Sequence, residues 1–125
     1  MKKANNFFEK AEVYFNKMGE EAKLQRLCVS YLQIQKSNWL IYHIKNAEPN
    51  AFLRIVYSWL GVVSGMPDLH IITPQTDFYV ELKTQKGKTS VFQKATHQKL
   101  LSLNKQVYTI NSFEDFLNLI KEKSL

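Results

Sequence analysis

Residues 61–83 read GVVSGMPDLHIITPQTDFYVELK and contain two short apolar runs that carry charge where a buried strand would carry none. The first run begins directly after Asp68, and the second contains Glu81 and Lys83. Because strand side chains alternate between two faces, Glu81 and Lys83 share one face of the second strand. The short turn at residues 74–77 joins the runs, so the stretch predicts an antiparallel hairpin with charge on one face.

Hydrophobic periodicity and turn residues extend this prediction to the rest of the chain. Strands are predicted over residues 39–44, 69–73, 78–83 and 106–110. Helices are predicted over residues 4–18, 20–35, 51–60, 90–103 and 112–120. The resulting element order, α-α-β-α-β-β-α-β-α, indicates a single domain of the α/β class.

Most of the predicted helices carry an apolar stripe at the spacing of an amphipathic helix. The stripe of the first helix is expected to dock on the core or on a second subunit, and it comprises Phe7, Phe8, Ala11, Tyr14, Phe15 and Met18. Three other helices are expected to bury Leu24, Leu27, Cys28, Tyr31 and Leu32; Phe92, Ala95, Leu100 and Leu103; and Phe113, Phe116, Leu117 and Ile120. Ser90 and Gln93 fit a capping box at a helix start, and Asn104 fits a left-handed helix stop.

Length and composition are those of one soluble globular domain, since the chain has 125 residues of which 45% are hydrophobic and 22% charged. No stretch approaches 18 consecutive apolar residues, and the N-terminus has no apolar run typical of a secretory signal. The single cysteine, Cys28, lies on an apolar stripe, which predicts a buried and inert thiol in a reducing compartment. These features predict a cytoplasmic protein with no membrane partner.

The net charge of +6 is a moderate excess that is common among nucleic-acid-binding proteins. Its distribution is more informative, because a group of lysines follows the acidic pair: Lys83, Lys86, Lys88, Lys94 and Lys99. The basic half of the chain is therefore expected to lie beside the acidic hairpin, where it can contact DNA phosphates.

A further acid precedes the hairpin in the second predicted helix. Extending the apolar stripe of that helix back by three residues from Leu24 reaches Glu21, with Gln25 four residues further on. The carboxylate of Glu21 is either a helix-start charge favoured by the helix dipole or a functional group that points inward. The segment alone leaves both interpretations open.

Asp68, twelve intervening residues and then Glu81-x-Lys83 form the pattern of the PD-(D/E)xK nuclease superfamily, with Pro67 before the aspartate. Four segments resemble, in order and spacing, the VRR-NUC family: Glu21-x-x-Leu24-Gln25, Gly65-Met66-Pro67-Asp68-Leu69, Glu81-Leu82-Lys83 and Gln93-x-x-x-His97. The resemblance covers residues 20–112 and departs from the family pattern at residues 46–49. It implies a restriction-endonuclease-like core over residues 20–125, with a small mixed sheet of about four strands flanked by helices. Residues 1–19 form an extra N-terminal helix, accessory or for dimerisation.

The resemblance also implies roles for individual side chains. Asp68 and Glu81 would hold Mg²⁺ or Mn²⁺ as hard oxygen ligands, with the backbone carbonyl of Leu82 as a third ligand and Glu21 completing the cluster directly or through water. Lys83 would orient the attacking water or stabilise charge on the phosphate, and Gln93 would contact the site. The residues expected to contact nucleic acid are Lys86, Lys88, Lys94 and His97.

The implied function is that of a metal-dependent DNA endonuclease, structure-selective for junctions or flaps, of phage or DNA-repair type and active as a homodimer. The alternative is a catalytically silent nucleic-acid-binding module with the same fold. A third possibility is a plain interaction domain, in which Glu81 and Lys83 form a surface pair and Asp68 only caps a turn. His43 and His70, each alone in an apolar strand, are expected to be core residues or to support the site.

Overall fold

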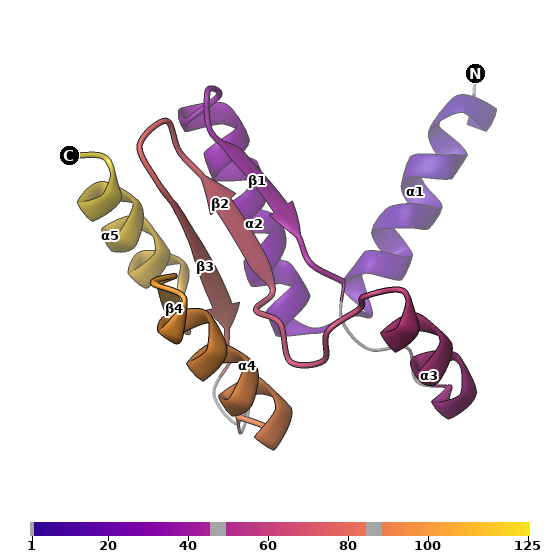
Figure 1. Ribbon diagram of the computed structural model, residues 1–125. Coiled ribbons are helices and arrows are strands. Elements are labelled where there is room, and N and C mark those ends of the chain that lie inside the picture. The colour runs from indigo at the N-terminus through magenta and orange to yellow at the C-terminus, as the bar shows by residue number, and fades with distance from the viewer. Residues whose placement is uncertain (1, 46–49, 85–88) are drawn as a thin grey trace.

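The computed structural model describes residues 2–45, 50–84 and 89–125, with side chains from residue 6 onward. The departure from the family pattern at residues 46–49 and the lysines Lys86 and Lys88 lie outside the described residues. Five helices are described, α1 (Lys2–Asn16), α2 (Glu20–Gln35), α3 (Ala51–Trp59), α4 (Val91–Ser102) and α5 (Phe113–Lys123). Four strands are described, β1 (Leu40–His43), β2 (Leu69–Ile72), β3 (Asp77–Leu82) and β4 (Val107–Ile110), so the element order over these residues is the predicted one (Figure 1).

The strands form one mixed sheet in the order β1-β2-β3-β4. β2 pairs antiparallel with both β1 and β3, whereas β3 and β4 are parallel. The predicted hairpin is therefore confirmed, with Leu69 opposite Val80 and Ile71 opposite Phe78. The parallel pair needs a crossover, and α4 supplies it between β3 and β4.

The hydrophobic core lies between one face of the sheet and the helices α2 and α5 (Figure 1). The strands contribute the inward half of the period-two pattern: Ile41, Leu69, Ile71, Phe78, Val80, Leu82 and Ile110. The helices contribute Leu24, Cys28, Leu32, Phe116, Leu119 and Ile120. Cys28 is buried as predicted, and burial raises the pKa of its thiol to about 12. None of the described helices is both long and apolar enough to span a bilayer.

Several helix residues predicted to be buried are exposed instead. In α4 only Leu100 is buried, while Phe92, Ala95 and Leu103 face solvent. Leu27 of α2 is also exposed. The reason is that each helix packs on the sheet along a narrower strip than its apolar stripe suggests, and α4 lies beside the edge strand β4 and reaches β3 only through polar side chains. In α5, by contrast, Leu119 is buried, which the predicted stripe omitted.

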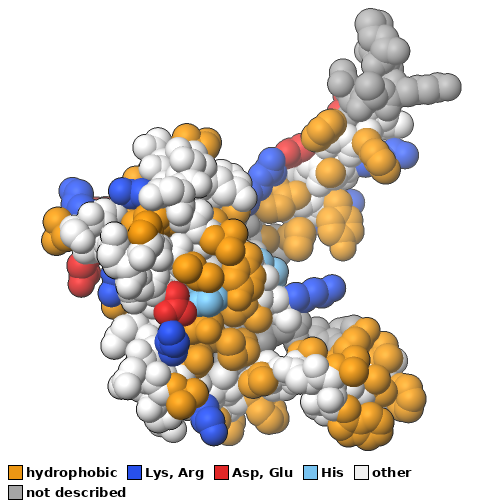
Figure 2. Space-filling model, turned by 45° about the horizontal axis from the view of Figure 1, so that its top comes forward, with side chains coloured by type: hydrophobic (Ala, Val, Ile, Leu, Met, Phe, Trp, Pro, Cys, Tyr) orange, Lys and Arg blue, Asp and Glu red, His pale blue; other side chains and the backbone are white. Residues whose placement is uncertain are grey.

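Of the two predicted partners for the apolar stripe of α1, the core or a second subunit, the structure excludes the core of the same chain. Among the described elements α1 contacts only α2, and Phe7, Phe8, Tyr14 and Met18 are exposed. Phe15 alone is half-buried, beneath the guanidinium of Arg26. α1 therefore projects from the domain, and its apolar side chains stay uncovered within one chain (Figures 1 and 2).

α3 also projects from the domain, and it buries none of its residues. The side chain of Asn50 begins it by accepting a hydrogen bond from the backbone N–H of Leu53 at 3.2 Å. Phe52, Ile55 and Trp59 are exposed, so the apolar side of this amphipathic helix faces solvent (Figure 2). The opposite, polar side of α3 is turned toward the sheet, where it borders the cleft described below.

Candidate active site

The two central acids meet at the end of the hairpin. Because Leu69 pairs with Val80, the register continues to place Asp68 opposite Glu81. One oxygen of Asp68, Oδ2, accepts a hydrogen bond of 2.7 Å from the backbone N–H of Leu82, which fixes the carboxylate across the end of β3. Both acids line a cleft of about 900 Å³ between α3 and the start of α4.

Glu81 is the most constrained acid of the site, with only 2% of its surface exposed. Its Oε2 accepts a hydrogen bond of 2.9 Å from Gln93 Nε2 and lies 3.8 Å from Lys83 Nζ. Its Oε1 is buried without a hydrogen-bond partner. Burial first, and then the charge of Asp68, raises the pKa of Glu81 to about 8, although Lys83 opposes the shift. In the metal-free protein Glu81 therefore keeps its proton at neutral pH.

Gln93 connects the start of α4 to this acid. It is the third residue of α4 and closes the capping box, in which the backbone N–H of Gln93 donates to Ser90 Oγ at 3.1 Å and the backbone N–H of Ser90 donates to Gln93 Oε1 at 3.0 Å. The same Oε1 accepts a hydrogen bond of 3.1 Å from Lys83 Nζ, while Nε2 donates to Glu81. The predicted capping box is confirmed, and its glutamine also orients Lys83 beside Glu81.

The segment before Asp68 packs tightly on the same helix start. Gly65 has a φ of +80°, and a Cβ there would lie 2.3 Å from the carbonyl oxygen of Phe92 and 2.7 Å from the backbone nitrogen of Gln93. Thr96 Oγ1 adds a hydrogen bond of 2.6 Å to the carbonyl oxygen of Ser64. Only glycine fits this conformation and spacing, so Gly65 fixes the loop carrying Asp68 against the helix carrying Gln93.

Glu21 lies at the start of α2 and borders the same cleft, although its side chain is exposed. Partial burial and then the charge of Asp68 raise its pKa, and Lys83 opposes the shift. This coupling to Asp68 favours the functional interpretation of Glu21 over that of a simple helix-start charge.

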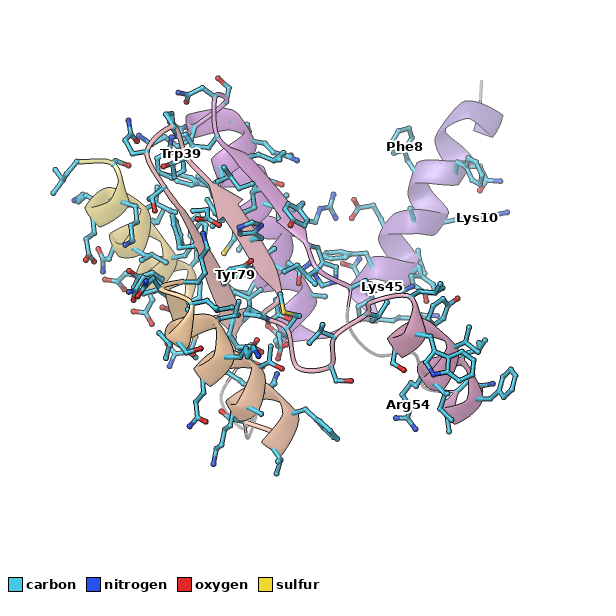
Figure 3. All side chains as sticks on the ribbon, in the orientation of Figure 1. Phe8, Lys10, Trp39, Lys45, Arg54 and Tyr79 are labelled. Carbon is cyan, nitrogen blue, oxygen red and sulfur yellow. The ribbon has the colours of Figure 1, made fainter. Side chains whose placement is uncertain are left out.

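The three histidines take different positions. His97 Nε2 is buried without a hydrogen-bond partner and lies 3.7 Å from Glu81 Oε1, and burial followed by the charge of Lys83 lowers its pKa. His70 is buried within a network: its ring nitrogens lie 2.8 Å from Tyr42 Oη and 2.8 Å from Asp77 Oδ2, and its ring stacks on Tyr79, labelled in Figure 3. His43 is exposed, with Nδ1 2.8 Å from the carbonyl oxygen of Asp68, so it supports the site but is not a core residue.

The cleft also contains residues that sequence reasoning missed. Arg54, Tyr57 and Ser58 of α3 line it, as does Lys45 just beyond β1. Arg54 and Lys45 are labelled in Figure 3. A sequence signal for this wall exists, because Arg54, Tyr57 and Ser58 follow the i, i+3, i+4 spacing of one helix face. Lys94, expected to contact nucleic acid, is exposed on α4.

The donor atoms suit a small divalent cation that keeps part of its water shell. Among residues 2–45, 50–84 and 89–125, no three His, Cys, Asp or Glu side chains converge as a ready-made metal cluster. Asp68 and Glu81 nevertheless offer hard oxygen ligands, and the buried Oε1 of Glu81 has no partner. Mg²⁺ usually binds through one or two carboxylates and retains several waters. The residues present therefore fit Mg²⁺ or Mn²⁺.

The fold is shared with solved VRR_NUC domains. One structure, described as "VRR_NUC domain protein", has a TM-score of 0.66 and 17% identity, and the match covers 82% of this chain and 86% of that one. A second, described as "VRR_NUC domain", has a TM-score of 0.58 and 21% identity, with 81% and 94% covered. No family model and no curated protein matches the sequence. The predicted core, a small mixed sheet of four strands flanked by helices, is thereby confirmed, and its fold is the one seen in these VRR_NUC domain structures.

Proposed function

We propose that this protein is a Mg²⁺- or Mn²⁺-dependent phosphodiesterase that cuts DNA. The observation that carries the proposal is the pairing of Asp68 with the buried Glu81, whose raised pKa and unpartnered Oε1 indicate a place for a cation. Two clustered carboxylates repel each other at low dielectric, and a divalent cation is the natural compensation. The shared fold with VRR_NUC domains adds support.

The groups that would hold the metal are Asp68, Glu81 and the backbone carbonyl of Leu82, with Glu21 completing the cluster directly or through water. When bound, a divalent cation polarises the phosphoryl oxygen and lowers the pKa of a coordinated water. The hydrogen bond from the backbone N–H of Leu82 holds Asp68 in place for this role, and that from Gln93 holds Glu81.

Lys83 is the group we propose to act on the phosphate. Its ammonium is held by the side-chain oxygen of Gln93 at 3.1 Å and stays 3.8 Å from Glu81 Oε2. From that position it can stabilise charge that develops on the phosphate or orient the attacking water. Loss of a preorganised electrostatic group of this kind typically slows the reaction on the order of 10²–10³-fold.

DNA is the substrate we propose, in the form of junctions or flaps. The net charge of +6 and the cations that border the cleft, Lys45 and Arg54 among them, support binding to phosphates. A second copy of the chain is the partner we propose for the uncovered apolar side of α1, with Phe7, Phe8 and Tyr14 in the interface. Two copies would present two sites to two strands of a branched substrate.

Cleavage assays test this function. Purified protein is incubated with four-way junctions, flaps, duplex and single strands in Mg²⁺, Mn²⁺ or EDTA. We expect cleavage only with metal, loss of cleavage in Lys83→Ala, and normal cleavage in Lys121→Ala, which removes an exposed lysine of α5 that does not border the cleft. Protein that binds DNA but cuts none of these substrates with metal would instead be the silent binding module. Binding should also weaken steeply with salt as counterions are displaced.

A further inference from the structure

Two aromatic side chains border the cleft from opposite walls. Phe92 comes from the first turn of α4 and is 68% exposed, and Tyr57 comes from α3 and is 38% exposed. Phe92 directly precedes Gln93, the residue that contacts Glu81. The cleft therefore has an exposed aromatic side chain next in sequence to the residue that contacts Glu81.

The exposure of Phe92 is not that of a loosely held segment. Its backbone contacts Gly65 too closely for any added Cβ, and the capping box of Ser90 and Gln93 encloses it. The hydrogen bond from Thr96 to the Ser64 carbonyl closes the same contact one turn later. A large apolar side chain exposed on a backbone held this firmly indicates a binding surface, because the backbone that carries it need not become ordered when a ligand covers the ring.

The basic side chains of the same cleft indicate that the ligand is negatively charged. Lys45 and Arg54 border it on one side and Lys83 on the other, so a strand of phosphates meets a cation at several points. Aromatic rings beside such cations are the combination that proteins use for single-stranded nucleic acid, in which the bases have free faces. Inside an intact duplex the bases stack on each other, and a side chain reaches their faces only by unstacking them.

We propose that the cleft binds a DNA strand with unpaired bases beside the scissile phosphate, with Phe92 and Tyr57 stacking on those bases. Arg54 and Lys45 contact the flanking phosphates. This inference rests on the proposed nuclease function and makes it more specific, because it assigns a preference for flaps over blunt duplex to named residues. The rings select for unpaired bases, and the cations bind any strand.

The test is binding in EDTA, where no cleavage occurs. Oligonucleotides carry 2-aminopurine, a base whose fluorescence falls on stacking, either in a single-stranded flap or at the centre of a blunt duplex. The variants are Phe92→Ala, Phe92→Trp and Tyr57→Leu. The matched control is Val91→Ala, since Val91 is an apolar neighbour that is 80% exposed and does not border the cleft.

We expect wild-type protein to quench the flap probe, and Phe92→Ala to weaken flap binding about tenfold and to remove most of the quenching. Tyr57→Leu should act in the same direction, whereas Phe92→Trp and Val91→Ala should bind like wild type. Equal losses on flap and blunt duplex, or no loss in either aromatic variant, would overturn the proposal. Because these measurements need no catalysis, a protein that binds flaps in this way but never cuts them refutes the nuclease function and leaves the stacking assignment standing.

Discussion

Replacing Glu81 with Gln should stabilise the metal-free protein, and the gain should grow with pH. Glu81 has a pKa of about 8 in the folded protein, against an ordinary value of 4.5. Below pH 4.5 both the folded and the unfolded chain carry the proton, so the titration of Glu81 does not change the free energy of unfolding there. Between pH 4.5 and 8 the unfolded chain loses the proton while the folded protein keeps it, so stability falls as pH rises and levels off above 8.

The size of the effect follows from the shift. Each pKa unit corresponds to about 1.4 kcal/mol, so the full window is worth about 5 kcal/mol in the free energy of unfolding. Glu81→Gln keeps an oxygen that can accept the hydrogen bond from Gln93 Nε2 and removes the titration. Its advantage over wild type should therefore be small at pH 5 and several kcal/mol at pH 8.

Urea unfolding in EDTA at pH 5, 6, 7 and 8 measures this difference, with Glu20→Gln as the control because Glu20 is an exposed acid of the same chain. The control should follow the wild-type profile. A difference between Glu81→Gln and wild type that stays flat from pH 5 to 8, or that favours wild type at high pH, would refute the reasoning about the buried acid.

Three further predictions concern the fold around the site. Gly65→Ala should lower the free energy of unfolding in urea by about 2–4 kcal/mol, because of its positive φ and its contact with α4. The control Gly61→Ala has a φ of +97° but its Cβ would meet nothing within 4 Å, so it should lose only about 1–2 kcal/mol, and equal losses would contradict the close packing. Asp77→Asn should lower the free energy of unfolding by about 1 kcal/mol at neutral pH, because the ammonium of Lys105 holds the pKa of Asp77 below its ordinary value. In thermal unfolding this loss should vanish as the pH falls through the lowered pKa, and a loss that persists at pH 2 would refute the ion pair as its cause. Cys28 should not react with Ellman's reagent in the native protein at pH 8 and should react in urea, since burial raises its pKa to about 12; rapid reaction of the native thiol would be the contrary result.

The acid pair could be placed from the sequence because two local rules agree there. The short turn sets the hairpin register, and the period-two alternation sets the face, so Asp68 and Glu81 must meet. The position of Gln93 could be predicted for a similar reason, since a capping box fixes where a side chain lies relative to the start of its own helix.

The walls of the cleft could not be predicted in this way. The stripe spacing that identified Phe92 as apolar and on a helix cannot distinguish a face that packs on the core from one that faces a ligand. The same limit applies to α3, where the polar face borders the cleft and the apolar face is in solvent. The contact of Gly65 with Phe92 joins segments far apart along the chain, so no local pattern reveals it.

The acid site is tested most directly by single-turnover cleavage of a DNA flap at pH 8 in Mg²⁺, with wild-type protein and Glu81→Gln compared at equal folded concentration. We predict that wild type cuts the flap, that EDTA stops it, and that Glu81→Gln cuts on the order of 10²-fold or more slowly. Cleavage by Glu81→Gln at the wild-type rate would contradict the assignment of Asp68 and Glu81 as the centre of the site.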